Sequence, residues 1–224
     1  MDTARAIGIG TDEAATLTGM LMTMGGHSAD TAQNFLKQTA ALAKSAGVAP
    51  GIIMADMAES SEEIASYSKD GGDNIAQAAV QARQMGLALS DVAGIADGLL
   101  DFETSLTAEM EASVMLGRQL NLQRARELAL AGDLEGMTAE VVKNVGSEAE
   151  FNKLNVLQRN ALADAIGVTV DQMAKMVKVS GKSNAQLLQI AARRQNTNPN
   201  MSADEAMNEV QREYDSLGTL AFSF

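Results

Sequence analysis

The stretch LADAIGVTVDQMAKMVK, residues 162–178, decides how this chain is interpreted. Ala163 is followed four residues later by Gly167, and Gly167 is followed by Val168. Two short helices joined by a tight turn at Gly167 would have the spacing of a DNA-binding helix-turn-helix. The same spacing also suits a structural corner, in which a small Ala lets two helices approach and Gly ends the first of them. Composition, charge and repeats in the rest of the sequence help to decide between these two hypotheses.

The composition predicts an all-α fold. The chain has 224 residues, of which 46% are hydrophobic but only 3% aromatic, with 14 Met and no Cys. A core must therefore consist of Ala, Leu, Ile, Val and Met, and most of these residues favour helices. The absence of Cys excludes disulfides and thiolate metal sites. A net charge of −12 disfavours nucleic acid and anionic lipid as partners.

Hydrophobic periodicity punctuated by Gly predicts a multi-helical array of short helices and helical hairpins. Ser147 with Glu150 and Ser202 with Glu205 predict capping boxes, and Pro50 suits a first helical turn. The predicted helices span residues 11–24, 28–46, 50–58, 61–68, 73–85, 90–102, 105–117, 120–131, 133–145, 148–165, 169–178, 182–195 and 203–217.

The predicted organisation has four parts. Residues 1–100 form helical-hairpin repeats, 101–195 a helical domain, 196–201 (NTNPNM) a linker, and 202–224 a C-terminal helix and tail. The N-terminus has no basic region followed by an apolar run, so no signal peptide is predicted. The most apolar window, residues 14–26, is too short to span a bilayer.

The corner at Gly167 is one of several. Gly8, Gly47 and Gly86 each follow an Ala by four residues and precede an aliphatic residue, and they are spaced by 39 residues. This spacing predicts a degenerate repeat of helical hairpins. The predicted structural corners are Ala43, Gly47, Ala82, Gly86, Ala163 and Gly167, with a further one at Ala4 and Gly8.

Repeated corners in an acidic chain favour a packing role over DNA recognition. A DNA reader needs side chains for base edges and cations for phosphates. The helix after Gly167 offers Asp171, Gln172, Lys175 and Lys178, whereas the helix after Gly86 offers no cation. A helix-turn-helix DNA-binding regulator therefore remains the alternative hypothesis.

The sequence predicts no catalytic, cofactor-binding or metal-binding residues and no enzymatic activity. His27 is the only histidine, so no histidine pair can hold a metal. The acidic pairs fit first turns or polar faces of helices, where carboxylates favour the helix dipole. They are Asp12 with Glu13, Glu62 with Glu63, and Glu109 with Glu111. The segment KDGGDN, residues 69–74, lacks the oxygen spacing of an EF-hand and predicts a flexible turn.

Two further patterns have a structural and a functional interpretation. The Met-rich segment GMLMTMGG, residues 19–26, suits a core, but it also allows a soluble helical adaptor with a Met-rich partner-binding face. Arg118, Arg124 and Arg126 lie among acidic residues, which predicts a mixed-charge helical surface with pairs three or four residues apart.

One part of the chain is similar to a known family. Residues 101–177 resemble a stretch of bacteriophage tail tape measure proteins, through EMEASVMLGRQLNLQRARELALAGD (109–133) and VGSEAEFNKLNVLQRNALADAIG (145–167). The resemblance implies a structural virion protein of the phage tail, present in the host cytoplasm during assembly and involved in tail assembly and length determination. Its implied partners are tail tube, tail tip or baseplate proteins and assembly chaperones, with self-association left open.

The chain also departs from this family. Tape measure proteins are usually far longer, with extended coiled-coil tracts and often membrane-active or peptidase segments, so we expect the chain to be a partial piece. Its own residues predict no membrane segment, no cofactor and no nucleic-acid partner. A compact chain of this length has a radius of gyration of about 17 Å. As one continuous helix it would extend roughly 340 Å. Because its helices lack long heptad tracts, we expect a folded knob at one end of the tail rather than a ruler segment.

Overall fold

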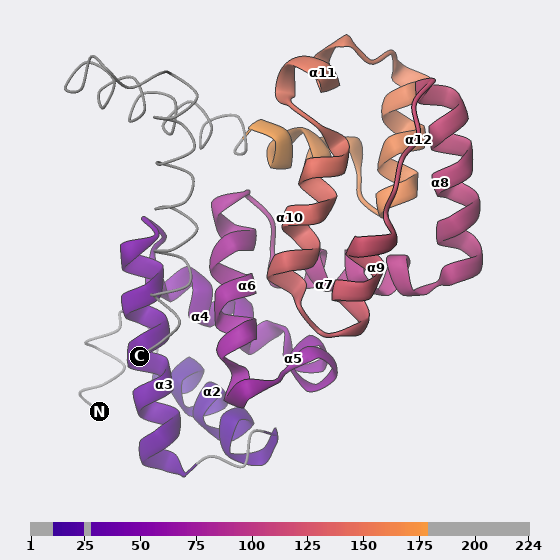
Figure 1. The fold of residues 1–224 in the computed structure, drawn as a ribbon. Coiled ribbons are helices and arrows are strands. Elements are labelled where there is room, and N and C mark those ends of the chain that lie inside the picture. Colours follow the sequence, from indigo (N-terminus) through magenta and orange to yellow (C-terminus); the bar gives the residue numbers. More distant parts are fainter. Residues whose placement is uncertain (1–10, 25–27, 179–224) are drawn as a thin grey trace, which may run out of the picture. The chain divides into compact units, whose positions relative to one another are not determined.

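The computed structural model describes residues 11–24 and 28–178, and within these ranges every regular element is a helix (Figure 1). This confirms the predicted all-α multi-helical array. The helices are α2 (Thr11–Met24), α3 (Ala29–Ser45), α4 (Pro50–Glu59), α5 (Ser61–Tyr67), the 3₁₀ turn η1 (Asp70–Gly72), α6 (Asp73–Gln84), α7 (Leu89–Leu100), α8 (Phe102–Leu116), α9 (Gln123–Leu130), α10 (Leu134–Val145), α11 (Glu148–Lys153) and α12 (Val156–Ile166). Residues 170–178 are also helical.

Helix boundaries agree with the predictions to within a few residues, with one exception. The predicted helix 148–165 is divided into α11 and α12, because Leu154 adopts an extended conformation. Asn155 then caps α12, accepting a hydrogen bond from Gln158 N (2.9 Å) while Gln158 Oε1 accepts one from Asn155 N (3.1 Å). This second capping box follows the one predicted at Ser147 and Glu150, which is present. The Asn-x-x-Gln spacing was the sequence signal that the single-helix prediction missed.

The chain divides into two compact units, Met1–Val177 and Lys178–Phe224. The predicted division at residue 100 falls inside the first unit, where α6 packs on α10 and α7 packs on α9. The predicted helices 182–195 and 203–217, the Ser202–Glu205 capping box, the linker 196–201 and the corner at Gly8 lie outside the described residues.

Helical hairpins joined at Gly corners build the first unit. α3 packs on α4 across Gly47, and α6 packs on α7 across Gly86. At each corner the residue after Gly donates its N–H to the carbonyl of the Ala five residues earlier: Val48 to Ala43 (2.8 Å), Leu87 to Ala82 (2.9 Å) and Val168 to Ala163 (3.0 Å). Each Gly has a positive φ, from 74° to 79°. These are Schellman helix ends, in which the left-handed residue satisfies carbonyls that the helix leaves free.

A further hairpin of the same kind escaped the sequence analysis. α9 packs on α10 across Gly132, whose φ is 70°, and Asp133 N donates to Leu128 O (2.9 Å). Leu128 rather than Ala stands four residues before Gly132, and Asp133 rather than an aliphatic residue follows Gly132. Asp133 instead caps α10 by accepting a hydrogen bond from Gly136 N (2.9 Å).

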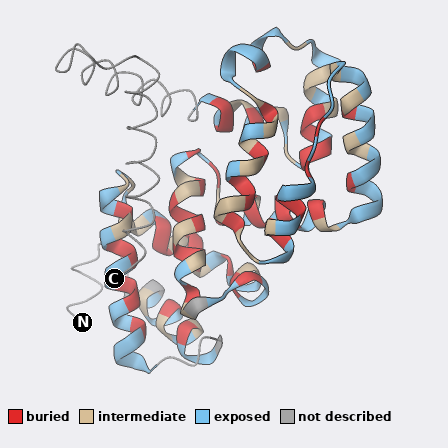
Figure 2. Ribbon diagram, viewed as in Figure 1, coloured by how far each residue is buried: buried red, intermediate tan, exposed pale blue. Residues whose placement is uncertain are grey.

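The core consists of the small and flexible side chains that composition predicted. Buried residues line the inner faces of the helices, and exposed residues cover the outer faces (Figure 2). Ala43, Ala82 and Ala163 are at most 2% exposed, which is how paired helices come close at the corners. The aliphatic residue after Gly is buried only in the case of Leu87, so it does not fill every corner.

One buried ion pair ties three helices together. Asp56 on α4 is 3% exposed and accepts two hydrogen bonds from the Arg83 guanidinium of α6 (2.9 and 3.0 Å). Its Oδ2 also accepts a hydrogen bond from Leu89 N at the start of α7 (3.0 Å). Burial raises the pKa of Asp56 even though Arg83 and the Leu89 N–H act in the opposite direction. Asp56 thus fixes the first turn of α7 against the preceding hairpin.

Candidate interaction surfaces

The Gly167 corner does not present a free recognition helix. Gln172 and Thr169 form a capping box, with Thr169 N donating to Gln172 Oε1 (2.8 Å) and Gln172 N to Thr169 Oγ1 (3.2 Å). The Gln172 amide also donates to Asp91 Oδ1 on α7 (2.8 Å). Both polar ends of the Gln172 side chain are therefore occupied within the chain.

The cations of this helix are similarly placed. Lys175 forms an ion pair with Asp171 one turn earlier (2.7 Å), and its stem lies against Gly86. Lys178 is exposed, while Met173, Met176 and Val177 are buried in the unit. Of the four residues that the DNA-binding hypothesis requires, two are engaged as a mutual ion pair and one as a helix cap. The Gln172–Asp91 hydrogen bond joins helix 170–178 to α7.

Two of the corners are neighbours in space, and the helix after Gly167 lies along α7. Gln84, just before the Gly86 corner, donates its side-chain amide to Ala46 O at the Gly47 corner (3.0 Å). Lys175 places Cδ 3.6 Å from the position that a Cβ on Gly86 would occupy. A Cβ on Gly98 of α7 would lie 3.9 Å from Gly167 Cα. The Gly47 and Gly86 corners therefore contact each other, while Gly167 lies beside the far end of α7.

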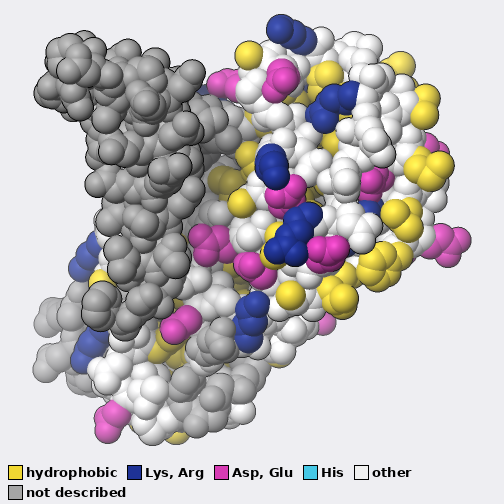
Figure 3. Space-filling model, in the orientation of Figure 1, with side chains coloured by type: hydrophobic (Ala, Val, Ile, Leu, Met, Phe, Trp, Pro, Cys, Tyr) yellow, Lys and Arg dark blue, Asp and Glu magenta, His cyan; other side chains and the backbone are white. Residues whose placement is uncertain are grey.

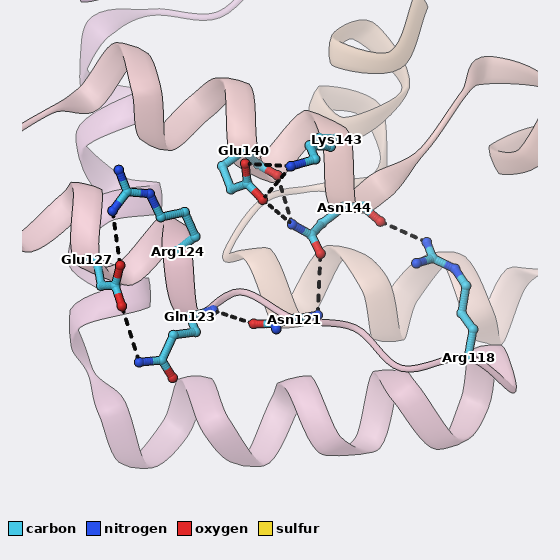
Figure 4. Close-up of a pocket in the computed structure, with 8 residues that line it drawn as sticks. All are labelled: Arg118, Asn121, Gln123, Arg124, Glu127, Glu140, Lys143 and Asn144. Atoms are coloured by element: carbon cyan, nitrogen blue, oxygen red, sulfur yellow. Dashed lines mark hydrogen bonds and ion pairs between the residues drawn. The ribbon is translucent and has the colours of Figure 1, made fainter.

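A pocket of about 330 Å³ lies between α10, α9 and the segment that precedes α9 (Figure 4). Its lining side chains are Arg118, Asn121, Gln123, Arg124, Glu127, Glu140, Lys143 and Asn144. Arg124 pairs with Glu127 (3.1 Å) and Lys143 with Glu140 (3.2 Å), while Arg118 donates to the carbonyl of Asn144 (2.8 Å) at the end of α10. Each of these charged side chains is therefore bonded to another residue that lines the pocket.

Arg126 departs from the predicted mixed-charge surface. The Arg124–Glu127 pair has the expected i, i+3 spacing, but Arg126 is only 5% exposed. Its guanidinium donates to Ser105 Oγ (2.8 and 3.1 Å) and pairs with Glu109 (2.5 Å), both on α8. The alternation of charges in the sequence could not distinguish this buried cross-helix pair from a solvated one.

The segment KDGGDN, for which we predicted a flexible turn, forms a 3₁₀ turn with hydrogen bonds to a distant part of the chain. Residues 70–72 form η1, and Lys69 Nζ donates to Ala131 O (2.9 Å). Asn74 Nδ2 donates to Tyr67 O (2.8 Å) and Gly132 O (3.2 Å). The segment is therefore docked on the α9–α10 corner, 58 residues away from Asn74 in the sequence.

Tyr67 adds a further link at the same place. Its hydroxyl donates to Asp97 Oδ1 on α7. Burial, followed by the hydrogen bond and the negative charge of Asp97, raises the pKa of the Tyr67 phenol. The Tyr67 hydroxyl thus stays protonated and acts as a donor that joins α5 to α7.

A row of apolar side chains on α8 faces solvent. Phe102, Leu106, Met110 and Val114 recur every four residues and are 51%, 48%, 71% and 83% exposed. We call these four residues the α8 stripe. Figure 3 shows hydrophobic side chains gathered along the edge of the molecule that α8 occupies in Figure 1. The opposite side of α8 packs on α12 and contains the buried residues Ser105 and Ala112.

The first turn of α12 extends this apolar surface. Gln158 Nε2 donates to Met115 O (3.0 Å), which places the start of α12 beside the end of α8. Val156 and Leu157 in that turn are 72% and 65% exposed, and Met115 is 50% exposed. The apolar surface therefore spans two helices and widens at the end where the stripe reaches Val114.

The other predicted features provide no comparable surface. In the described part of the Met-rich segment Leu21 is buried, whereas Met22 is 44% exposed. Glu62 and Glu63 lie in the first turn of α5, as predicted, and Glu109 pairs with Arg126. His27 lies outside the described residues. In the described ranges no three His, Asp or Glu side chains converge as metal ligands.

The comparisons with known proteins add no relative. The chain matches no protein-family model, and no curated protein or solved structure is significantly similar to it. Among the helices that the structure describes, none has both the length and the apolar character needed to cross a membrane.

Proposed function

We propose that this chain is a structural, non-enzymatic part of a bacteriophage tail tape measure protein, with a role in tail assembly and length determination. The proposal rests on the resemblance of residues 101–177 and on the way that apolar surface is distributed over the described residues. It places the chain in the virion, and in the host cytoplasm during assembly.

The observation that carries the proposal is where the exposed apolar side chains lie. Of the ten large hydrophobic residues exposed in the described ranges, Met22 and Ile52 precede residue 101, and the other eight lie between Phe102 and Leu157. The segment that resembles tape measure proteins is thus the segment with surface left for a partner, since contiguous exposed apolar patches mark interaction sites. Tail tube, tail tip or baseplate proteins and assembly chaperones are the partners this role implies.

The DNA-binding alternative has less support. Gln172 is engaged with Thr169 and Asp91, and Lys175 is paired with Asp171. Specific readout would require these side chains to give up their internal partners, in a chain whose net charge is −12. The adaptor alternative needs a Met-rich face, but the large apolar surface lies on α8 and α12 instead.

A direct test uses the phage or prophage whose genome encodes the chain. Mass spectrometry of purified tails should detect peptides from residues 101–177, and genes for tail tube and baseplate proteins should flank the coding sequence. Tails that contain no peptide of this chain, together with neighbouring genes unrelated to a tail, would refute the proposal. Retention on duplex DNA at low salt would favour the regulator instead.

A further inference from the structure

We propose that the α8 stripe is a docking site for a basic amphipathic helix of a partner protein. This inference goes beyond the tail role and does not depend on it, because it follows from the shape, exposure and charge of α8 alone. It identifies the partner by its chemistry: an α-helix with an apolar row and with Lys or Arg beside that row.

The shape of the stripe favours a helix as the occupant. Phe102, Leu106, Met110 and Val114 form one i, i+4 ridge, which runs for about 18 Å along α8 at 1.5 Å per residue. Such ridges pack into the grooves between side chains of a second helix. Isolated exposed side chains need no explanation, but four in one ridge, continued by Val156 and Leu157, leave an unpartnered face of a packed unit.

The charge beside the stripe favours a basic partner. The neighbouring row on the exposed side of α8 contains Glu103, Thr107 and Glu111, all of them exposed. Neither Glu103 nor Glu111 has an ion-pair partner among the residues that the structure describes. α8 contains no Lys or Arg, and its third Glu, Glu109, is paired with Arg126, so the charges on its exposed side are the carboxylates of Glu103 and Glu111. Lys or Arg flanking an apolar row would complement this pattern and would also select against other helices.

The same charges argue against the other possible occupants. If α8 packed against α8 of a second copy in antiparallel fashion, Glu103 of one copy would approach Glu111 of the other. α8 itself offers no Lys or Arg that could offset these carboxylates in such a pairing. An anionic lipid surface would be repelled by Glu103 and Glu111. A basic helix is the occupant that both the apolar ridge and the acidic row accept.

The experiment compares two synthetic helical peptides of about 16 residues, close to the length of α8. Both contain the same Leu row; one has Lys and the other Glu at the flanking positions. Fluorescence anisotropy measures their binding to the full chain. We expect the Lys peptide to bind about tenfold or more tightly than the Glu peptide at low salt, and the difference to shrink as salt screens the charges.

Variants locate the binding site. The double substitution Met110→Ser and Val114→Ser leaves the charge unchanged, so it distinguishes docking on the stripe from general attraction between a cation and an acidic chain. It should weaken binding of the Lys peptide about tenfold or more. Ile52→Ser, which removes a side chain of similar exposure on α4, should leave the affinity unchanged. Glu103→Gln with Glu111→Gln should reduce the preference for Lys over Glu.

Three outcomes would overturn the proposal. Equal binding of the two peptides would remove the charge argument. Unchanged affinity of the Met110→Ser, Val114→Ser variant would remove the stripe as the site. A chain that sediments as a dimer, and becomes a monomer in that variant, would assign the stripe to a second copy instead. Circular dichroism of each variant checks that its helical content is unchanged.

Discussion

At the scale of single residues, the corners depend on the backbone freedom of Gly. Gly167 has a φ of +79°, and a Cβ added there would meet nothing within 4 Å. The space is therefore free, and the constraint is the left-handed backbone that side chains with a Cβ disfavour. Gly94, in the middle of α7, has equally open surroundings but no positive φ. The two positions separate the effect of the backbone from the effect of packing.

We therefore expect opposite effects of the same substitution at these two positions. Gly167→Ala should lower the free energy of unfolding by about 1 kcal/mol, because Ala is strained at a positive φ. Gly94→Ala should raise it by about 0.5–1 kcal/mol, because Ala favours a helix interior over Gly. Urea denaturation of both variants measures these changes. Equal effects at the two sites would show that the conformation of Gly167 does not limit stability.

A second residue-scale prediction concerns pH and the cap of α11. Hydrogen bonds from the N–H and hydroxyl of Ser147 lower the pKa of Glu150 from its ordinary value of 4.5. A carboxyl whose pKa is lowered by folding stabilises the protein above pH 4.5, and that contribution is lost as the pH falls through the folded pKa. Glu150→Gln should therefore destabilise the chain at neutral pH, with a difference from wild type that disappears in acid.

The matched control for this experiment is Glu148→Gln, in the same first turn but without the bonds to Ser147. Urea denaturation at a series of pH values gives both differences. Burial raises the pKa of Asp56 and of Glu135, which favours folding in acid, but both carboxyls are present in every variant and cancel in the comparison. A Glu150→Gln effect of the same size at all pH values would contradict the assignment.

At the scale of elements, α8 is the helix whose position needs most explanation. It leaves one face in solvent, and its packing comes from α12 and from the end of α7. The buried Arg126 of α9 reaches Ser105 and Glu109 of α8 and so ties the two helices together. Removing one member of such a pair leaves the other charge buried without a partner, which is costly.

We expect Arg126→Met alone to cost about 3 kcal/mol of stability. Adding Glu109→Met should recover at least about 1 kcal/mol of this loss, because the uncompensated carboxylate is removed. Arg124→Met, which breaks the exposed pair with Glu127 on the same helix, should cost less than about 0.5 kcal/mol. A double-mutant cycle by chemical denaturation tests this, and additive effects of the two Met substitutions would show that the pair does not couple α8 to α9.

At the scale of the whole molecule, the packed hairpins bear on how this piece would serve a tail. A ruler must be extended, whereas the hairpins of the first unit fold back on one another at Gly corners. A folded unit of this kind fits a knob at one end of the tail better than a length-setting rod. This extends the proposed function and is testable on assembled tails.

Deleting Gly47 to Met85 removes one 39-residue period and joins Ala46 to Gly86, so that Ala43 still precedes a Gly by four residues. The deletion also removes Asp56 and Arg83 together, so neither charge is left without the other. If the unit is a knob, electron microscopy should show tails of unchanged length or no assembled tails. A ruler segment would instead shorten the tail by roughly 60 Å, and proportional shortening would overturn our choice.

Local features were the most predictable from sequence. The helical class, Pro50 at the start of α4, the Ser147–Glu150 box and the left-handed glycines at 47, 86 and 167 all depend on interactions within a few residues. The missed features of this kind, the Asn155–Gln158 box and the Gly132 corner, are also local. Their residue types differ from Ser-x-x-Glu and from Ala followed four residues later by Gly. The same hydrogen bonds to neighbouring backbone groups nevertheless form.

What the sequence determined by itself, then, is where helices begin, end and turn, because hydrogen bonds to neighbouring backbone groups decide these points. Only the tertiary structure decided which side chains are covered. Arg126 and Arg124 lie two residues apart in one helix, yet one is buried against α8 and the other is exposed. Met110 and Ala112 lie just as close in α8, and only Ala112 is buried. Burial depends on which distant helix packs on a given face, so the α8 stripe is defined only by the packing of α12 and α7 and the contacts of Arg126 on the rest of α8.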